Sequence, residues 1–240
     1  MGDQWVEQSG KTRSIRSFVV RRARMNESHR SAIRDHGDTY IVSSDELCRA
    51  PLEAFPDTCG PRGGGRLLLE IGFGMGHATA IMAGTWSRDA IVGVEVYPPG
   101  VGRLIAELRE RGLSNVRIVR ADAVDVLESW NRETLVDGTH VFFPDPWPKK
   151  RHHKRRLVQV SFLQSVYERS RAGAYLYLVT DWEDYAYHMR DVVAEFGLFT
   201  VEDPDEDGFS RPRDWRPTTA FERKGLAKGH RVRELFLRRS

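Results

Sequence analysis

Apolar and polar positions follow two different periods along the chain. Five short runs of mainly apolar residues occur at 66–72, 91–96, 116–121, 139–144 and 174–180. Helix-length segments lie between and after them, at about 77–86, 99–111, 123–131, 155–170 and 183–196, and residues 100–112 have the i, i+3, i+4 apolar spacing of a helix that covers a sheet. Residues 231–239 alternate like a closing edge strand. Strands that alternate with helices predict a doubly wound, mostly parallel α/β sheet.

The first 65 residues lack this order. They are basic, they contain Pro51, Pro56 and Pro61, and they end in the run Gly63–Gly65. Proline and glycine at this density are typical of irregular connections. We therefore expect a basic arm and linker over residues 1–65 and a single domain over residues 66–240.

Each of the five predicted strands ends at or beside a carboxylate. These acids are Glu70, Glu95, Asp122, Asp145 and Asp181. Ligands of such sheets bind at the carboxyl ends of the strands, so we expect the five acids to lie around one site.

A glycine-rich loop, with Gly72, Gly74 and Gly76, follows the first strand. A dinucleotide fingerprint would have its third glycine at position 77, which is His77 here, and this argues against NAD or FAD. His77 is better explained as the first residue of a helix than as a catalyst. The alternative to a ligand-binding loop is a structural turn in some other α/β protein.

The acids next to this loop suggest the ligand. Glu70 could pair with a cationic amino group, Glu95 could accept both hydroxyls of a ribose, and Asp122 could accept the N6 amino group of adenine. An adenosine joined to an amino acid describes S-adenosylmethionine, which we expect as the cofactor.

The stretch FPDPW, residues 143–147, ends the fourth strand. Pro144 and Pro146 stiffen the loop, so that Asp145 can point into the site and accept hydrogen bonds from the N1–H and N2–H₂ edge of a guanine. Trp147 either stacks on a base or packs in the core. The cations that follow are candidate phosphate contacts, with an exposed helix start as the alternative: Lys149, Lys150, Arg151, Lys154, Arg155 and Arg156.

Composition adds a partner to this picture. Three segments, 11–34, 149–156 and 211–239, hold 24 of the 37 Lys and Arg residues against four acidic residues. If the segments converge in space they form a footprint for a polyanion such as a nucleic acid; if they do not, they are solvated surfaces. No stretch reaches the roughly 18 apolar residues of a membrane span. Cys48 and Cys59 form neither a metal-spaced pair nor a disulfide framework, so we expect a cytoplasmic protein without a metal.

Several stretches together resemble the bacterial tRNA (guanine-N7)-methyltransferases. The matching stretches are EIGFGMG, GVEVYPPGVGRL, FPDPWPKKRHHKRR, LVTDWEDYA and RPTTAFERKGLAKGHRVRELFLRR, and IRSFVVRRARM is similar to the N-terminal segment of that family. The resemblance implies a class I methyltransferase fold, which is Rossmann-like, with a seven-stranded sheet and helices on both faces. It also implies methyl transfer from S-adenosylmethionine to N7 of a guanine at position 46 in the variable loop of tRNA.

The resemblance assigns roles to residues as well. The cofactor positions of the family fall on Glu70, Glu95, Asp122 and Asp145, and its tRNA-contacting positions fall on Lys149, Asp181, Thr219, Ala220, Phe221 and Glu222. By composition alone, Thr219 to Glu222 is equally a capping box that starts a helix.

The expected chemistry needs no general base, because guanine N7 carries a lone pair and no proton. It needs N7 held in line with the methyl group, and such positioning is worth roughly 7–11 kcal/mol. Asp145 is the expected catalytic residue, since it would orient the base and offset the positive charge of the product. Two rival functions are a methyltransferase for another base or a small molecule, and a non-catalytic RNA-binding module. With tRNA as the partner, we expect no obligatory partner protein and either a monomer or a homodimer.

Overall fold

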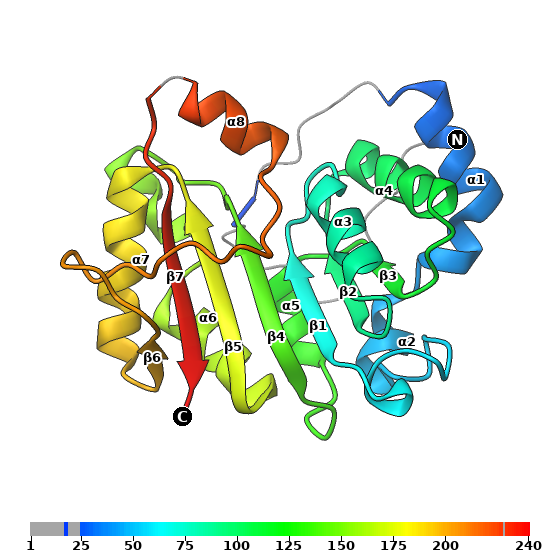
Figure 1. Ribbon diagram of the computed structural model, residues 1–240, viewed down its shortest axis with the longest axis horizontal. Coiled ribbons are helices and arrows are strands. Elements are labelled where there is room, and N and C mark those ends of the chain that lie inside the picture. Colours follow the sequence, from blue (N-terminus) through cyan, green and yellow to red (C-terminus); the bar gives the residue numbers. More distant parts are fainter. Residues whose placement is uncertain (1–16, 19–24, 228) are drawn as a thin grey trace.

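Seven strands form one sheet in the computed structural model, which describes residues 17–18, 25–227 and 229–240 (Figure 1). The strands are β1 Leu67–Ile71, β2 Ala90–Val94, β3 Val116–Val119, β4 Val136–Phe142, β5 Ser170–Thr180, β6 Phe199–Val201 and β7 Arg233–Arg239. Their order is β3-β2-β1-β4-β5-β7-β6. Strands β1 to β5 are parallel, and β7 is antiparallel to both of its neighbours. The doubly wound, mostly parallel sheet predicted from the sequence is confirmed.

Helices cover both faces of this sheet. They are α1 Glu27–Tyr40, α2 Ser44–Arg49, α3 His77–Thr85, α4 Pro98–Glu110, α5 Ala123–Ser129, α6 Val160–Arg169, α7 Glu183–Phe196 and α8 Ala220–Leu226, with short 3₁₀ helices η1 Pro61–Gly63 and η2 Lys150–Arg155. Apolar side chains from α2, α5, α6 and α7 form the core on one face. Those from α1, α3 and α4 form the core on the other. Among the described residues, no helix has both the length and the apolar character to cross a bilayer.

Residues 202–219, which we call the strap, connect β6 to α8 across the second face of the sheet (Figure 1). Trp215 holds the strap down, because its ring centroid lies 4.9 Å from that of Trp86 and 5.4 Å from that of Tyr177. Aromatic pairs at such distances stabilise packing beyond the area that they bury. The strap therefore brings α8 to the edge of the sheet where the parallel strands end.

Two details of the predicted elements are wrong. The helix predicted over 155–170 begins at Val160, because residues 150–155 form η2. Residues 233–239 are not an edge strand, since β7 lies between β5 and the three-residue strand β6. Leu235 and Leu237 enter one core while Phe236 enters the other, which is the burial of an internal strand.

The segment expected to be an irregular linker is partly helical. Asn26 caps α1 by accepting a hydrogen bond from the backbone N–H of His29, and α1 packs so closely on α4 that a Cβ at Gly102 would lie 2.5 Å from the carbonyl oxygen of His29. Leu47 and Phe55 are buried in the core. The expectation of irregular structure is wrong for α1 and α2, while most of the predicted basic arm before Met25 lies outside the described residues. The division of the chain near residue 65 stays a prediction.

Candidate active site

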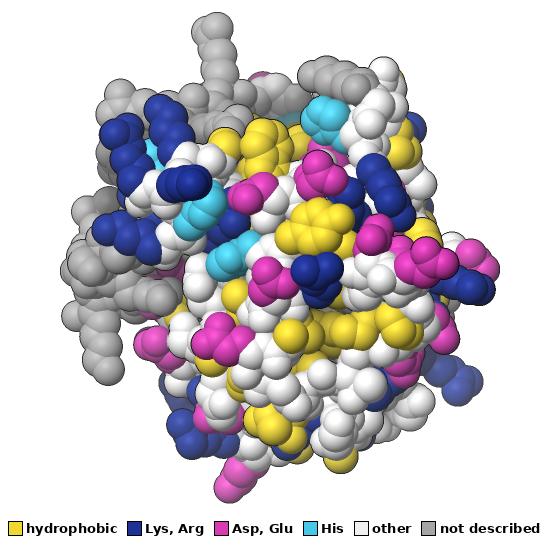
Figure 2. Space-filling view, turned by 90° about the vertical axis from the view of Figure 1, so that its left-hand side faces the viewer, with side chains coloured by type: hydrophobic (Ala, Val, Ile, Leu, Met, Phe, Trp, Pro, Cys, Tyr) yellow, Lys and Arg dark blue, Asp and Glu magenta, His cyan; other side chains and the backbone are white. Residues whose placement is uncertain are grey.

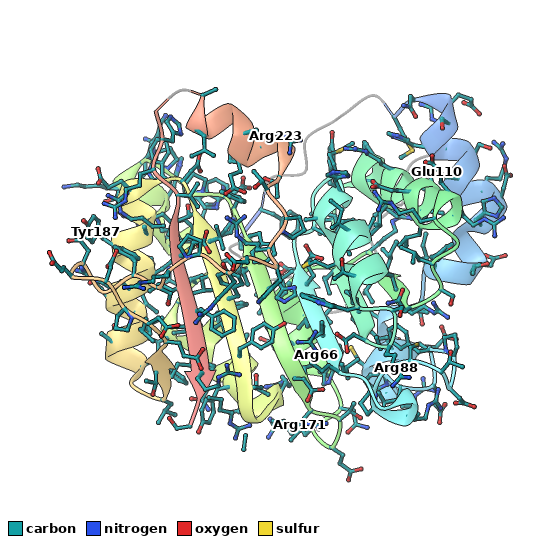
Figure 3. The ribbon with its side chains drawn as sticks, in the orientation of Figure 1. Arg66, Arg88, Glu110, Arg171, Tyr187 and Arg223 are labelled. Carbon is teal, nitrogen blue, oxygen red and sulfur yellow. The ribbon has the colours of Figure 1, made fainter. Side chains whose placement is uncertain are left out.

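The parallel strands bring the five predicted acids to one edge of the sheet, at the top of Figure 1. Figure 3 shows Arg223 of α8 above this edge, whereas Arg66 and Arg171 lie at the opposite edge. The acids differ in environment, and these differences decide what each can do.

Glu70 is the most unusual of the five. It is only 2% exposed, and its Oε2 atom has no hydrogen-bond partner among the described residues. Burial raises the pKa of Glu70 to about 7, against the effect of the Thr79 hydroxyl, and the charge of Glu95 raises it further. An unpartnered buried carboxylate oxygen is costly, so this position favours a cationic hydrogen-bond donor.

Glu95 closes the glycine loop onto β2. Its Oε2 accepts a hydrogen bond from the N–H of Gly74 at 2.7 Å, and its Oε1 accepts from the N–H groups of Val96 and Tyr97 at 2.7 and 3.0 Å. Burial raises the pKa of Glu95; these amides oppose the rise, and the charge of Asp145 adds to it. The charge of Glu95 thus acts on Glu70, and the charge of Asp145 acts on Glu95.

The loop glycines serve two purposes. Gly72 and Gly74 both have positive φ, and a Cβ at either would meet nothing within 4 Å, so there is open space beside the loop. Gly76 also has positive φ, but a Cβ there would lie 2.6 Å from the Cβ of Leu104 on α4. Gly76 is therefore required for packing, while Gly72 and Gly74 leave room beside Glu70. His77 begins α3, as predicted, and its Nδ1 lies 3.0 Å from Glu107.

Asp122 lies at the start of α5. Its Oδ1 accepts a hydrogen bond from the N–H of Val124 at 3.0 Å, which makes it the N-cap of the helix. The capping role fixes where this carboxylate lies relative to Glu95.

Asp145 is exposed on a backbone that bends sharply on both sides. Phe143 and Trp147 both adopt positive φ, at 53° and 45°. Non-glycine residues rarely adopt this conformation, and when they do they often cluster at functional sites. Within the described part of the chain, no side chain or amide hydrogen-bonds the Asp145 carboxylate, which is open to solvent.

Trp147 follows the core-packing alternative. It is 8% exposed, its Nε1–H donates to the carbonyl oxygen of Ser17 at 2.9 Å, and the guanidinium of Arg155 lies 4.5 Å from its ring centroid. The indole ring is therefore buried, bonded to Ser17 and covered on one face by Arg155.

The basic run divides into exposed and buried members. Lys149, Lys150, Arg151 and Lys154 are exposed. Figure 2 shows a group of Lys, Arg and His side chains at the upper left of its face, on the side of α6. The prediction of a phosphate contact does not hold for Arg156, whose buried guanidinium pairs with Asp184 and donates to the carbonyl oxygen of Pro146.

Asp181 follows β5 and borders a cleft of about 480 Å³, which the loop before β7 closes on the other side. Its Oδ2 lies 3.0 Å from Nδ1 of His230. The cleft lining also contains Trp182, which is 37% exposed. Asp181 thus joins the end of β5 to the segment after α8.

The predicted substrate residues of α8 adopt the capping box. The Thr219 hydroxyl accepts from the N–H of Glu222, and the Glu222 carboxylate accepts from the N–H of Thr219. Ala220 is the first residue of the helix. Phe221 is 57% exposed, and its ring centroid lies 5.5 Å from that of Phe143 at the end of β4.

Three residues that the sequence did not single out, Arg216, Glu234 and Tyr177, form a buried chain of hydrogen bonds that ends at Glu222. Arg216 pairs with both Glu222 and Glu234, and Tyr177 donates its hydroxyl hydrogen to Glu234. A glutamate inside the apolar run of β7 was the available signal, because a buried carboxylate requires a buried partner.

Known proteins resemble this chain over most of its length. A family model described as "Putative methyltransferase" matches residues 65–235. The tRNA (guanine-N(7)-)-methyltransferase of Ralstonia nicotianae is 42% identical over 99% of this chain and 91% of its own length, and that of Burkholderia cenocepacia is 44% identical over 95% and 86%. The corresponding protein of Marinobacter nauticus is 42% identical over 95% and 93%.

Solved structures support the fold. The 16S rRNA methyltransferase KamB aligns with a TM-score of 0.51 at 16% identity, over 73% of this chain and 88% of that one. TrmN from Thermus thermophilus aligns with a TM-score of 0.51 at 16% identity, over 82% of this chain and 48% of that one. At this identity the likeness concerns the fold, which is that of the class I methyltransferases.

Proposed function

The chain belongs to the tRNA (guanine-N(7)-)-methyltransferase family, and from that premise we propose that it transfers a methyl group from S-adenosylmethionine to N7 of a guanine in tRNA. The observation that carries the proposal is the near-complete alignment with relatives of that name, which extends over the loop of Asp145 and over β7. The variable loop of tRNA, as the resemblance implies, is the proposed location of the guanine. The reaction is proposed to occur in the cytoplasm, where the free thiols of Cys48 and Cys59 are stable.

The residues at the edge of the sheet fit this cofactor. Glu70 has an unpartnered buried oxygen, and the amino group of the methionine part is a cationic donor that would satisfy it. The open space beside Gly72 and Gly74 allows a ligand to lie against the loop backbone. When bound, S-adenosylmethionine supplies an electrophilic methyl group on a positively charged sulfur.

The raised pKa values of Glu70 and Glu95 also support a positively charged ligand. Glu70 and Glu95 both have raised pKa values, partly through like charge nearby, so a cation between them lowers the energy of the ionised site. Glu95 is assigned to the ribose hydroxyls and Asp122 to the adenine amino group. Both carboxylates already bind backbone amides, which fixes their orientation before any ligand arrives.

Asp145 is assigned to the base. Its carboxylate is exposed, open to solvent and held on a bent loop at the end of β4. It orients the guanine through the N1–H and N2–H₂ edge and offsets the positive charge that the purine acquires. Since N7 has no proton to lose, no residue of the chain has to act as a base.

The exposed cations Lys149, Lys150, Arg151 and Lys154 are assigned to the phosphates of the same tRNA. They lie in and just before η2, four to nine residues after Asp145 along the chain. Phosphate contacts position a nucleic acid without reading its sequence. The choice of guanine is therefore assigned to Asp145 and not to these cations.

The deciding experiment is methyl transfer from labelled cofactor to bulk tRNA that lacks 7-methylguanosine, followed by nucleoside mass spectrometry. We expect 7-methylguanosine as the product. Methylation at another atom or of a small molecule would replace this proposal with the first rival function. Cofactor binding without any transfer would favour the RNA-binding module.

A further inference from the structure

Arg216 of the strap is a buried arginine near the candidate site that pairs with two acids. Its side chain is 6% exposed, and its Nη1 and Nη2 donate to the two oxygens of Glu222, both at 2.7 Å. The same Nη2 donates to Oε1 of Glu234 at 2.8 Å. Burial alone would lower the pKa of Arg216, but the bonds to Glu222 and Glu234 raise it above its ordinary value. The guanidinium is therefore a permanent cation that bridges α8 and β7.

Glu222 uses its carboxylate entirely within the protein. One oxygen accepts from the N–H of Thr219 in the capping box, and both accept from Arg216. Its side chain is 6% exposed. These contacts leave Glu222 poorly placed to bind a base directly, so its contribution to a substrate has to pass through the position of α8.

Helix α8 is short, and its described apolar side chains are exposed. It contains seven residues, and a helix of that length is not stable on its own. Phe221 and Leu226 are 57% and 50% exposed, so these apolar side chains provide little burial. Among the described contacts of α8, the buried ones are the ion pair between Arg216 and Glu222 and the close packing of Gly225 against Asp181.

The other end of the pair is rigid. Glu234 is 3% exposed within β7, and the hydroxyl of Tyr177 on the neighbouring strand β5 also binds it. The guanidinium of Arg216 lies 5.9 and 6.0 Å from the rings of Phe142 and Phe143, at the end of β4. The Arg216 side chain thus contacts β7, α8 and the end of β4, the strand that leads to Asp145.

We propose that Arg216 is a positioning residue, which fixes α8 over the end of β4 so that the exposed face of the helix confronts the guanine next to Asp145. Phe221 is the side chain that this placement sets against the site (Figure 1 shows α8 above the strand ends). The inference rests on the proposed function, and it makes Glu222 a link in the scaffold where the resemblance implies a tRNA contact.

The test compares two conservative variants in the same strap. Arg216→Lys keeps the charge but loses the two-pronged bond to Glu222. Arg213→Lys is the matched control, because Arg213 pairs with Glu202 and Asp203 and not with α8. We expect the single-turnover rate of methyl transfer, at saturating tRNA and cofactor, to fall at least about tenfold for Arg216→Lys and to change less than about twofold for Arg213→Lys. Cofactor affinity should change less than about twofold in both.

Hydrogen exchange tests the placement of the helix without methyl transfer. The N–H groups of Arg223 and Ala227 bond to Thr219 and Arg223 inside α8. We expect them to exchange at least about tenfold faster in Arg216→Lys and at the wild-type rate in Arg213→Lys. A wild-type protein that forms no 7-methylguanosine would refute the proposed function and leave this measurement intact.

A double variant separates positioning from direct contact. Glu222→Gln alone should reproduce the loss of rate, and it serves as the second variant if Arg216→Lys does not fold. In Arg216→Lys combined with Glu222→Gln, the rate should be no more than about threefold below that of the slower single variant, since both break one link. Additive losses in the double variant would mean that Glu222 binds the substrate itself. An unchanged rate and unchanged hydrogen exchange in folded Arg216→Lys would mean that other contacts hold α8. Either result overturns the inference.

Discussion

Replacing Glu70 with glutamine is expected to make the folded protein more stable and its cofactor binding weaker. Glu70 is buried, one of its oxygens has no partner, and its pKa is about 7 in the folded state against 4.5 ordinarily. The folded state therefore holds this proton more tightly than the unfolded chain does. As pH rises from about 4.5 to 7, the unfolded chain releases the proton first and stability falls; above 7 the full cost, about 3 kcal/mol, is present.

Glutamine has the same shape and no charge, so Glu70→Gln removes this cost, which grows as pH rises from about 4.5 to 7. The gain in unfolding free energy should be larger at pH 8 than at pH 5 by about 2 kcal/mol, measured by urea denaturation at both values. Glu110→Gln, on the exposed surface of α4, is the control that should change neither value. A variant whose stability differs from that of wild type by the same amount at both pH values would refute the assignment of a charged, buried Glu70.

Cofactor affinity should move in the opposite direction. Loss of a charge-assisted hydrogen bond to the amino group should weaken binding by about 1.5–3 kcal/mol in Glu70→Gln at pH 7.5, by calorimetric titration. Wild-type affinity should fall roughly tenfold from pH 7.5 to pH 6, because Glu70 must release a proton on binding, and the variant should lose most of this dependence. Unchanged affinity in the variant would mean that the amino group binds elsewhere.

Two further predictions concern the loop and the basic run. Alanine at Lys149, Arg151 and Lys154 should lower the slope of log affinity for tRNA against log salt by roughly 0.7–0.9 per lost phosphate contact. Arg156→Ala is the control, which should leave this slope unchanged and cost about 1–3 kcal/mol of stability. A slope that the triple change does not affect would mean that the basic run is a solvated surface. Asp145→Asn should slow single-turnover methyl transfer at least about tenfold. The wild-type rate with saturating substrates should stay nearly flat from about pH 6 to 8.5. A steep rise of the wild-type rate in that window, absent in the variant, would indicate proton abstraction instead.

The sequence was sufficient for the edge of the sheet that carries the acids. Strand ends are visible as the last residue of an apolar run, and parallel strands end at a common edge, so Glu70, Glu95 and Asp145 could be placed together without coordinates. The glycine loop was equally readable, because its positive φ values require glycine whatever the distant contacts are.

Long-range contacts were not readable in the same way. Trp147 donates its indole N–H to Ser17, 130 residues earlier, so no local pattern could decide between stacking and packing. Arg156 looks like its neighbours in sequence, and only contacts with Asp184 and with the carbonyl of Pro146 distinguish it from them. The edge assignment of β7 failed because its partner β6 is three residues long, too short for periodicity to reveal.

The insertion of β7 between β5 and β6 also orders the synthesis of the molecule. A growing chain contains β1 to β5 before residues 233–239 exist, so the edge of β5 that later forms six residue pairs with β7 stays open to any other strand. Arrival of β7 closes that edge and at the same moment delivers Glu234, the anchor of Arg216. A chain that stops short of Arg233 contains the strands that carry the proposed cofactor residues, but it lacks Glu234 and therefore the ion pair beneath α8. The open edge of β5 in such a product would also be free to pair with strands of other chains.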